Sequence, residues 1–249
     1  MIRLVWWWIP ICLAVGTQAC QPKSKAQEII DRAIAVHGGE AYEKAIISFD
    51  FRDIHYQIMK TPSAFEYSRE FQDSSGNVLD VLNNAGFTRS VNGNKIDLTA
   101  ERENAYSNSV NGVAYFAFLP YGLNDEAARK TWIKESVLEG KSYDLIKVDF
   151  REEGGGEDFE DEFLYWINKD TGQMDYLAYS YHTDGGGIRF RKGINQRRVQ
   201  GILFQDYLNY KPADEELPLE EIELLFNQQE LELFTRIEKE NIQVQFLAD

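Results

Sequence analysis

The sequence predicts a mainly β fold of the α+β type. We expect a curved antiparallel meander sheet or an unclosed barrel that packs on an N-terminal helix and a central helical segment. From Ile46 onward, apolar and polar residues alternate along short segments, as is typical of β-strands. The turns between these segments are short, and short connections join antiparallel neighbours. Residues 20–249 contain no internal repeat and no low-complexity linker, so we expect one β-rich domain.

Residues 1–19 have the layout of a secretory signal peptide. A positive start at Arg3 precedes an apolar run over residues 4–15, which is too short for a spanning helix. Ala19 and Cys20 then resemble the lipobox of bacterial lipoproteins, in which the cysteine is acylated and becomes the first mature residue. The residues before Ala19 depart from the usual lipobox, which leaves ordinary cleavage and a free Cys20 as the alternative.

The predicted location follows from this N-terminus. Gln21 stands where an inner-membrane retention aspartate would be, so we expect a lipid-anchored protein of the outer membrane that faces the periplasm. The whole chain carries 26 Lys and Arg against 41 Asp and Glu, a formal net charge of −15. Such a surface repels nucleic acid and anionic lipid head groups, so we expect no nucleic-acid partner and a membrane contact only through the anchor.

The N-terminal helix has clear start and stop signals. Ser24 followed by Gln27 forms a capping box, and Gly38-Gly39 ends the helix. His37 falls in the last turn, where the helix dipole favours a cation, and we expect a structural or capping role for it. Residues 40–45 are expected to add a short second helix.

The remaining elements follow in order. ISFDFRDIHYQI is expected to form a half-buried strand, FEYSREF and NVLDVL to flank a turn at residues 73–76, and FTRSVNGNKIDL to form a hairpin at Asn92-Gly93. A helical stretch then covers residues 99–119, and a second series of strands follows. Residues 219–226 are expected to be helical, and residues 230–246 to form a strand pair or one long strand. The strands of the second series are expected at residues 131–139, 142–152, 162–168, 173–183, 187–192 and 202–210.

Two strands of the second series are apolar on both faces. Residues 163–167 place aromatic or aliphatic side chains on each face, with Tyr165 on one face and Trp166 on the other. Residues 176–181 continue this pattern. A sheet with one solvated face would show polar residues there, so both faces require cover. Helices in the concavity of the sheet would leave either a packed core or an apolar cleft.

The stretch SYHTDGGGIRFR, residues 180–191, is the first candidate for a site. Glycines after Asp184 are typical of a hairpin turn, whereas a phosphate-binding loop would lead into a helix, and none is predicted there. We therefore interpret it as a hairpin and keep its polar side chains as a possible cluster. The candidate ligand-binding residues are Trp166, Tyr179, Tyr181, His182, Asp184, Arg189 and Arg191.

Other chemistry is weakly supported. The acidic segment 152–162 around Gly154–Gly156 could in principle hold Ca²⁺, but its spacing fits no EF-hand, and a solvated hairpin tip is preferred. His55 lies within a predicted strand, where a hydrogen-bonded structural role is the default. The sequence has no G-x-S-x-G or H-E-x-x-H motif. We expect no enzyme, no metal site and no cofactor.

Several segments carry a resemblance to a known family. AIAVHGGEAYEKAIISFDFRDIHY, FLPYGLND, FLYWINKDTGQMDYLAYSYHTDGGGIRFR and NYKP resemble Bacteroidota envelope lipoproteins of undefined function. The anchor, N-terminal helix and meander are also similar in architecture to the periplasmic lipoprotein-carrier fold, an unclosed barrel whose apolar groove is covered by helices. That resemblance implies binding of an acyl chain or another apolar ligand between sheet and helices. The alternative is a non-catalytic envelope scaffold or protein-interaction module.

Overall fold

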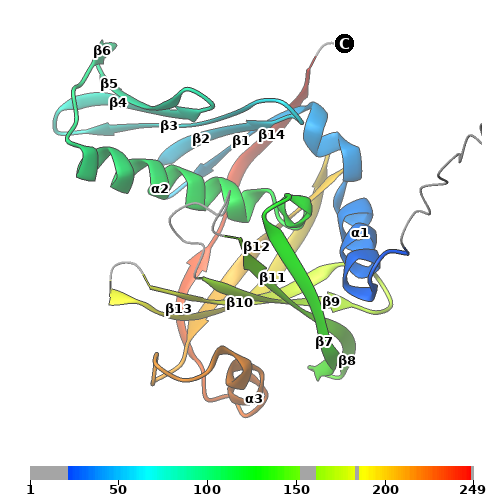
Figure 1. The fold of residues 1–249 in the computed structure, drawn as a ribbon. Coiled ribbons are helices and arrows are strands. Elements are labelled where there is room, and N and C mark those ends of the chain that lie inside the picture. The colour runs from blue at the N-terminus through cyan, green and yellow to red at the C-terminus, as the bar shows by residue number, and fades with distance from the viewer. Residues whose placement is uncertain (1–21, 152–160, 183–184, 248–249) are drawn as a thin grey trace, which may run out of the picture.

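Two antiparallel sheets of seven strands each form the framework of the molecule (Figure 1). The computed structural model describes residues 22–151, 161–182 and 185–247. The first sheet has the order β14-β1-β2-β3-β4-β5-β6 and the second the order β13-β12-β11-β10-β9-β8-β7. Among the described residues, all strand pairs are antiparallel, and each joins successive strands of the chain except the pair of β1 with β14, so the predicted meander is confirmed. The predicted unclosed arrangement is confirmed as well.

The strands have the following bounds. In the first sheet these are β1 (Ala45–Phe51), β2 (Ile54–Lys60), β3 (Phe65–Asp73), β4 (Gly76–Asn83), β5 (Gly86–Val91), β6 (Asn94–Lys95) and β14 (Glu240–Phe246). In the second they are β7 (Ala128–Leu138), β8 (Lys141–Phe150), β9 (Glu162–Asn168), β10 (Met174–Tyr181), β11 (Gly187–Val199), β12 (Ile202–Lys211) and β13 (Glu232–Ile237). β11 runs to Val199, beyond the predicted end at residue 192, because its polar second half still pairs with β12 across a bulge.

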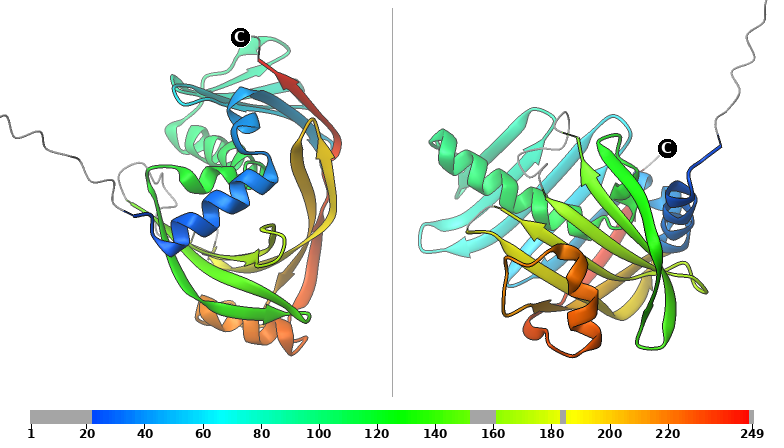
Figure 2. Two further views of the ribbon diagram at one scale, coloured as in Figure 1. Left: turned by 90° about the vertical axis from the view of Figure 1, so that its right-hand side faces the viewer. Right: turned by 60° about the horizontal axis from the view of Figure 1, so that its bottom comes forward.

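The helices lie on both sides of this framework. Figure 2 shows the sheets curving around α1 (Lys25–His37) and α2 (Ala100–Ala117), with α3 (Ile222–Asn227) on the outside. Ser24 caps α1 by accepting a hydrogen bond from the backbone N–H of Gln27, and Gly38 ends the helix at φ 143°, both as predicted. The predicted short second helix is a 3-10 helix, η1 (Gly39–Lys44). Two further 3-10 turns are η2 (Tyr121–Asn124) and η4 (Leu219–Glu221).

Both faces of β9 and β10 are covered, as their sequence required. Phe163, Tyr165 and Leu177 pack on one face with the apolar stripe of α1. Leu164, Trp166 and other side chains of the opposite face pack under η4 and α3, through Leu219 and Ile222. Burial of a large apolar side chain contributes about 1.5–3 kcal/mol, so these two layers fix the centre of the second sheet.

His37 joins α1 to the second sheet as a neutral side chain. It is buried, and its Nε2 accepts a hydrogen bond from the backbone N–H of Met174 at 3.1 Å. The predicted structural role is therefore confirmed, but the expectation that the last turn favours a protonated His37 is wrong. Burial, helped by the charge of Arg198, lowers the pKa of His37 to about 4, because an imidazolium in this site would lose its hydration.

Residues 232–246 cross from one sheet to the other. β13 pairs with β12 at the edge of the second sheet, and β14 pairs with β1 at the edge of the first. Figure 1 shows the two strands as one extended segment spanning the molecule. Of the two predicted arrangements, a single long strand is nearer to the structure, because β13 and β14 pair with different sheets and not with each other.

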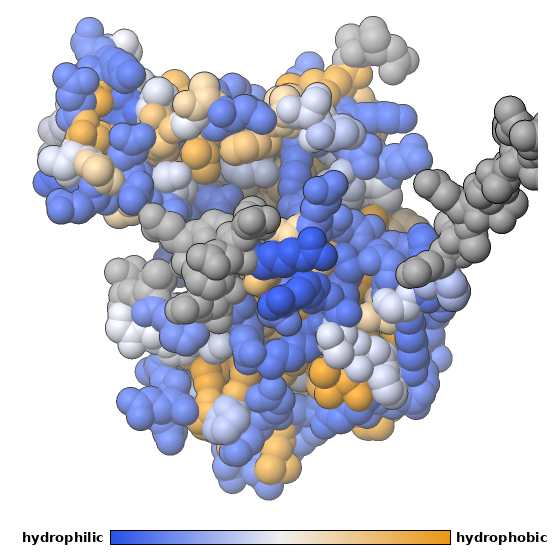
Figure 3. Space-filling view, viewed as in Figure 1, coloured by the Kyte–Doolittle hydropathy of each residue, from blue (hydrophilic) through white to orange (hydrophobic). Residues whose placement is uncertain are grey.

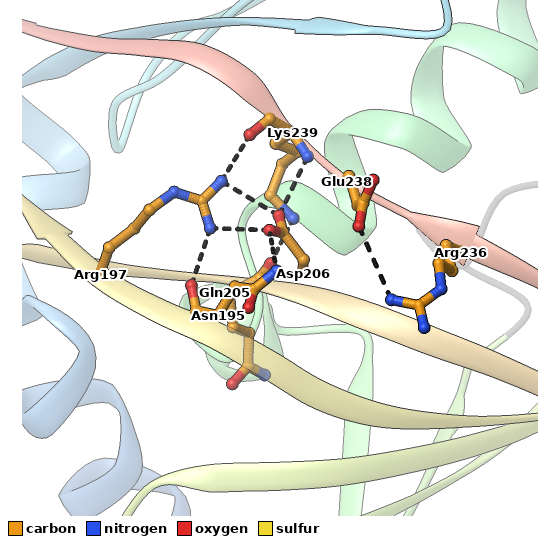
Figure 4. Close-up of polar contacts among 7 residues, drawn as sticks. All are labelled: Asn195, Arg197, Gln205, Asp206, Arg236, Glu238 and Lys239. Carbon is orange, nitrogen blue, oxygen red and sulfur yellow. Dashed lines mark hydrogen bonds and ion pairs between the residues drawn. The ribbon is translucent and has the colours of Figure 1, made fainter.

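A buried carboxylate holds the point of crossing, and we call its contacts the Asp206 network (Figure 4). Arg197 donates to both oxygens of Asp206, at 3.1 and 3.0 Å. The backbone N–H of Lys239 donates to the same carboxylate at 3.0 Å, and the carbonyl of Lys239 accepts from Arg197. Bidentate, charge-assisted hydrogen bonds of this kind are strong and directional. The network therefore fixes the chain where it leaves β13 and enters β14.

We expect Asp206→Asn to lower the free energy of unfolding by about 3–5 kcal/mol, because it leaves the guanidinium of Arg197 without its buried counterion. Urea denaturation measures this change. The control is Glu238→Gln, which removes the exposed partner of Arg236 in the same segment and should cost about 0–1 kcal/mol. Equal effects of the two substitutions would contradict the role given to Asp206.

His37 should make the stability depend on pH in the acidic range. Below a pKa of 6.5 the unfolded chain protonates this histidine, whereas the folded chain keeps it neutral down to about 4. Stability is therefore lost as the pH falls from 6.5 to about 4, by at most about 3 kcal/mol.

This loss is measured by urea denaturation at several pH values in the wild type and in His37→Gln. The variant should show a smaller loss, since the titrating group is gone. A His37→Gln curve parallel to that of the wild type would argue against this assignment.

Candidate ligand-binding cleft

A cleft of about 300 Å³ lies between α2 and the concave side of both sheets. This volume is at the lower end of the range of about 300–1,000 Å³ that is usual for small-molecule sites. Its lining comes from α2, from β1 and the turn after it, from β11 and β12, and from the crossing segment. The lining residues are Phe49, Phe51, Arg52, Asn108, Ser109, Gly112, Val113, Phe116, Ala117, Arg191, Tyr207, Asn209, Phe234, Thr235, Ile237 and Lys239.

The side of α2 that faces the cleft combines small and apolar residues. Val110 and Ala114 are buried against the first sheet, whereas Val113 and Phe116, half-buried, border the cleft. Gly112 directly precedes Val113, and a Cβ atom added to Gly112 would meet nothing within 4 Å. A helix interior normally disfavours glycine, so the missing side chain here leaves space along the cleft.

Two arginines and one carboxylate fix α2 on the first sheet. Asp80 is fully buried and accepts hydrogen bonds from Arg69 at 2.8 Å and from Arg89 at 2.6 and 2.8 Å. Arg69 also donates to Ser109 on α2 at 2.7 Å, and the guanidinium of Arg89 lies 3.5 Å from the ring centroid of Tyr106. One wall of the cleft is therefore held by a buried ionic cluster as well as by apolar packing.

Arg191 reaches the cleft from β11. It is 9% exposed, donates to the hydroxyl of Tyr179 at 2.7 Å, and places its guanidinium 3.9 Å from the ring centroid of Phe116. Its Nε is buried and has no hydrogen-bond partner among the described residues. A buried donor without a partner costs about 1–3 kcal/mol, more for a charged group.

Asn209 on β12 is a second incompletely bonded group in the cleft. Its side chain is 5% exposed, and Nδ2 donates to the hydroxyl of Thr235 at 3.1 Å. Its Oδ1 is buried without a partner in the described part of the chain. Tyr207, two residues earlier on the same face, is held by a hydrogen bond from Gln205 at 3.0 Å.

Lys239 enters the cleft from the point of crossing. Its Nζ donates to the carbonyl of Gln205 at 2.7 Å, and the Asp206 network fixes its backbone. Burial lowers the pKa of Lys239 to about 8; Asp206 opposes this shift, and Arg197 and Arg191 add to it. At neutral pH the ammonium group is still mostly protonated.

The charge of the cleft differs from that of the molecule. The face seen in Figure 3 is mostly hydrophilic, and the chain as a whole has a net charge of −15. The described residues that line the cleft, by contrast, include three cations, Arg52, Arg191 and Lys239, and no aspartate or glutamate. An apolar cleft with excess positive charge attracts anionic ligands more strongly than the rest of the surface does.

The structure brings together four of the seven candidate residues predicted from sequence. β10 and β11 form the expected hairpin, with Tyr179 opposite Arg189 and Tyr181 opposite Gly187. Arg191 contacts Tyr179, and Arg189 donates to the hydroxyl of Tyr181 at 2.7 Å. Of these four, only Arg191 lines the cleft, because Arg189 is committed to Glu215 at 2.6 Å.

The other candidates lie elsewhere. Trp166 is fully buried on the opposite face of the sheet and donates to Glu223 at 2.9 Å. His182 is largely exposed, with its Nδ1 3.5 Å from Asp161. Asp184 and the predicted acylation site Cys20 fall outside the described residues, as does the acidic stretch 152–160.

Sequence reasoning missed the contributions of α2, β12 and the crossing segment to this site. Tyr207 and Asn209 are buried on one face of β12, and a polar side chain at an alternating position on such a face is a usable signal. No comparable signal marks Gly112 or Lys239, because their role depends on how distant segments meet.

Three further observations limit the chemistry. His55 is hydrogen-bonded to Asp50 at 2.6 Å, in agreement with its predicted structural role. Within the described ranges, no group of three or more His, Cys, Asp or Glu side chains could hold a metal ion. Also within those ranges, no helix combines the length and apolar character needed to cross a membrane.

Comparison with solved structures finds proteins of similar fold and little sequence identity. A LolA superfamily protein from Nitrosomonas europaea superimposes with a TM-score of 0.51 at 9% identity, covering 91% of this chain and 96% of that one. A domain described as an outer membrane lipoprotein-sorting protein from Vibrio parahaemolyticus gives a TM-score of 0.48 at 8% identity, with 90% and 94% covered. The first of these likenesses shows the fold.

Comparison by sequence is more specific. No curated protein matches the chain. The model of one protein family matches residues 8–239, which is nearly the whole sequence. The chain therefore belongs to DUF6503, a family of unknown function.

Proposed function

We propose that this protein is a non-catalytic, lipid-anchored protein of the bacterial envelope that binds an acyl chain or another apolar ligand. The ligand would lie in the cleft between α2 and the two sheets. The observation that carries the proposal is this cleft, whose apolar walls come from β1, α2, β12 and β13. Clefts with mainly apolar walls and a few polar groups are typical ligand sites.

The fold supports this proposal independently of the cleft. The sequence predicts, from its resemblance to periplasmic lipoprotein carriers, an unclosed barrel with an apolar groove under helices. The structure has such a framework, and a solved LolA superfamily protein shares it. Fold alone does not determine function, so the shared fold supports ligand binding only in addition to the cleft.

The composition of the cleft favours binding over catalysis. General acid–base catalysis most often uses histidine or a carboxylate, and covalent catalysis often uses cysteine or serine beside a base. The described lining residues include no histidine, aspartate, glutamate or cysteine. Ser109 has no such base beside it and accepts its hydrogen bond from Arg69. These features support a role in holding a ligand.

The N-terminal sequence supports the envelope location. A signal peptide over residues 1–19 followed by Cys20 would place two acyl chains at the start of the mature protein. α1 begins at Lys25, so the described fold would start within a few residues of the anchor. The proposal therefore places the cleft close to a membrane surface.

Gly112→Leu tests the site directly. The added side chain would extend into the cleft, and we expect it to weaken binding of the neutral apolar probe N-phenyl-1-naphthylamine by about tenfold or more. Replacing a helical glycine by leucine should raise helix stability by up to about 1 kcal/mol, so lost binding would not reflect unfolding. Probe fluorescence measures affinity, and thermal denaturation measures stability.

Asn111→Leu is the matched control for this experiment. It adds the same side chain one residue away, on the exposed side of α2, and should leave probe affinity unchanged. If Gly112→Leu bound the probe as well as the wild type did, the ligand would have to lie elsewhere. A wild type that bound no apolar probe would refute the proposed function.

Cys20→Ser tests the anchor. We expect the variant to accumulate in the soluble periplasmic fraction or to remain unprocessed, because the acyl chains that hold the mature protein on the bilayer would be lost. Labelling with an alkyne fatty acid, followed by fractionation, measures this. Cys12→Ser, within the predicted signal peptide, should label normally. A wild type without label would show that the N-terminus is an ordinary signal peptide.

A further inference from the structure

Within the described part of the chain, the two cations on the sheet side of the cleft have no acidic partner in an ion pair. Within the described residues, no carboxylate oxygen lies within 4.0 Å of a nitrogen of Arg191 or Lys239. The nearby cations do have such partners: Arg189 pairs with Glu215, Arg197 with Asp206, and Lys192 with Glu139. In a chain with 41 acidic residues, this local lack of acids sets the cleft apart.

An unpaired cation in a buried site is costly. Arg191 is 91% removed from solvent relative to the extended residue, and its contacts are a tyrosine hydroxyl and an aromatic ring. Neither contact neutralises the charge, and its Nε has no partner among the described residues. Removing the counterion of a buried charge is strongly destabilising, so a site of this kind favours an anion that restores the balance.

Lys239 faces the same cleft and adds a second charge. Within the described residues, its one side-chain hydrogen bond goes to a backbone carbonyl, which leaves two N–H groups of the ammonium for another acceptor. Asp206, whose charge acts on Lys239, already accepts two hydrogen bonds from Arg197. Arg191 and Lys239 also act on each other, since Arg191 contributes to the lowered pKa of Lys239.

We infer that the ligand is a single-chain amphiphile whose acidic head group, a carboxylate or a phosphate, binds between Arg191 and Lys239. This inference rests on the proposed function and names the class of ligand. The Nε–H of Arg191 and the ammonium of Lys239 donate charge-assisted hydrogen bonds to the head-group oxygens. The unpaired Oδ1 of Asn209 accepts from a hydroxyl group of the ligand where one is present.

The walls of the cleft suit the rest of such a molecule. Val113 and Phe116 of α2 line the cleft together with Phe234 and Ile237 of β13, so an alkyl chain leaving the head group runs along apolar side chains. The volume of about 300 Å³ accommodates one chain better than several. The ligand is therefore expected to have one chain and one anionic end.

The experiment is a displacement titration with N-phenyl-1-naphthylamine bound to the folded protein. The competitors share a palmitoyl chain and differ in the head group: palmitate, palmitoyl lysophosphatidic acid and neutral monopalmitin. We expect at least one of the two anionic competitors to bind about tenfold or more tightly than monopalmitin, as charge-assisted hydrogen bonds imply. The ranking of palmitate against lysophosphatidic acid distinguishes carboxylate from phosphate.

Substitutions locate the effect. Arg191→Met and Lys239→Met keep apolar stems of similar length. Each should lower the affinity for the preferred anionic competitor by about tenfold while leaving the affinity for monopalmitin unchanged. Lys192→Met is the matched control, because Lys192 lies beside Arg191 in β11 but pairs with Glu139 outside the cleft. Thermal denaturation checks folding, and Lys239→Met carries the test if Arg191→Met does not fold.

The outcomes separate this inference from the proposed function. If the probe binds but monopalmitin competes as well as both acids, the inference is overturned and the apolar site stands. An equal loss of affinity for all three competitors in Arg191→Met and Lys239→Met would also overturn the inference, since such a result would show a general effect on the cleft. If neither the probe nor any competitor binds the wild type, the proposed function itself is wrong.

Discussion

The crossing of the last extended segment from one sheet to the other is the constraint on which the cleft depends. β13 completes the second sheet and β14 the first, so the position of the residues between them sets how the two sheets meet. Asp206 fixes that position by accepting from the side chain of Arg197 and from the backbone of Lys239. The same residue, Lys239, then extends its side chain into the cleft, and Phe234 and Ile237 of the preceding strand form part of its wall. One buried carboxylate thus sets the geometry of the fold and of the candidate site.

The distribution of charge follows a consistent pattern around that site. Buried carboxylates pair with arginines on both flanks of the cleft: Asp80 pairs with Arg69 and Arg89 behind α2, and Asp206 pairs with Arg197 beneath the crossing. These ion pairs hold the walls of the cleft in place. Arg191 and Lys239, which line the cleft, make their side-chain hydrogen bonds among the described residues to uncharged groups. Structural ion pairs and unpaired cations are therefore separated in space, which is the arrangement expected where a rigid frame presents charge to an anion.

Much of the fold could be predicted from the sequence, because short-range patterns determine it. The capping residues of α1, the alternation of the strands and the two-faced apolar pattern of β9 and β10 all report local physics that the structure confirms. Long-range features could not be read in the same way. The site prediction found Arg191 but placed Trp166 with it, since alternation alone does not show which face meets α2 and which meets α3. The crossing at Lys239 and the gap at Gly112 arise only when segments distant in sequence come together.

The crossing segment also bears on the order in which the molecule can assemble. Strands β1 to β6 and β7 to β12 are hairpin-connected series, and each pairs mostly with its neighbours in sequence. Until residues 232–246 arrive, however, β1 and β12 are edge strands whose backbone groups lack partners on one side. During synthesis from the N-terminus, both half-sheets would therefore have open edges until the last segment emerges. A chaperone that shields strand edges would act in this interval, before the cleft exists.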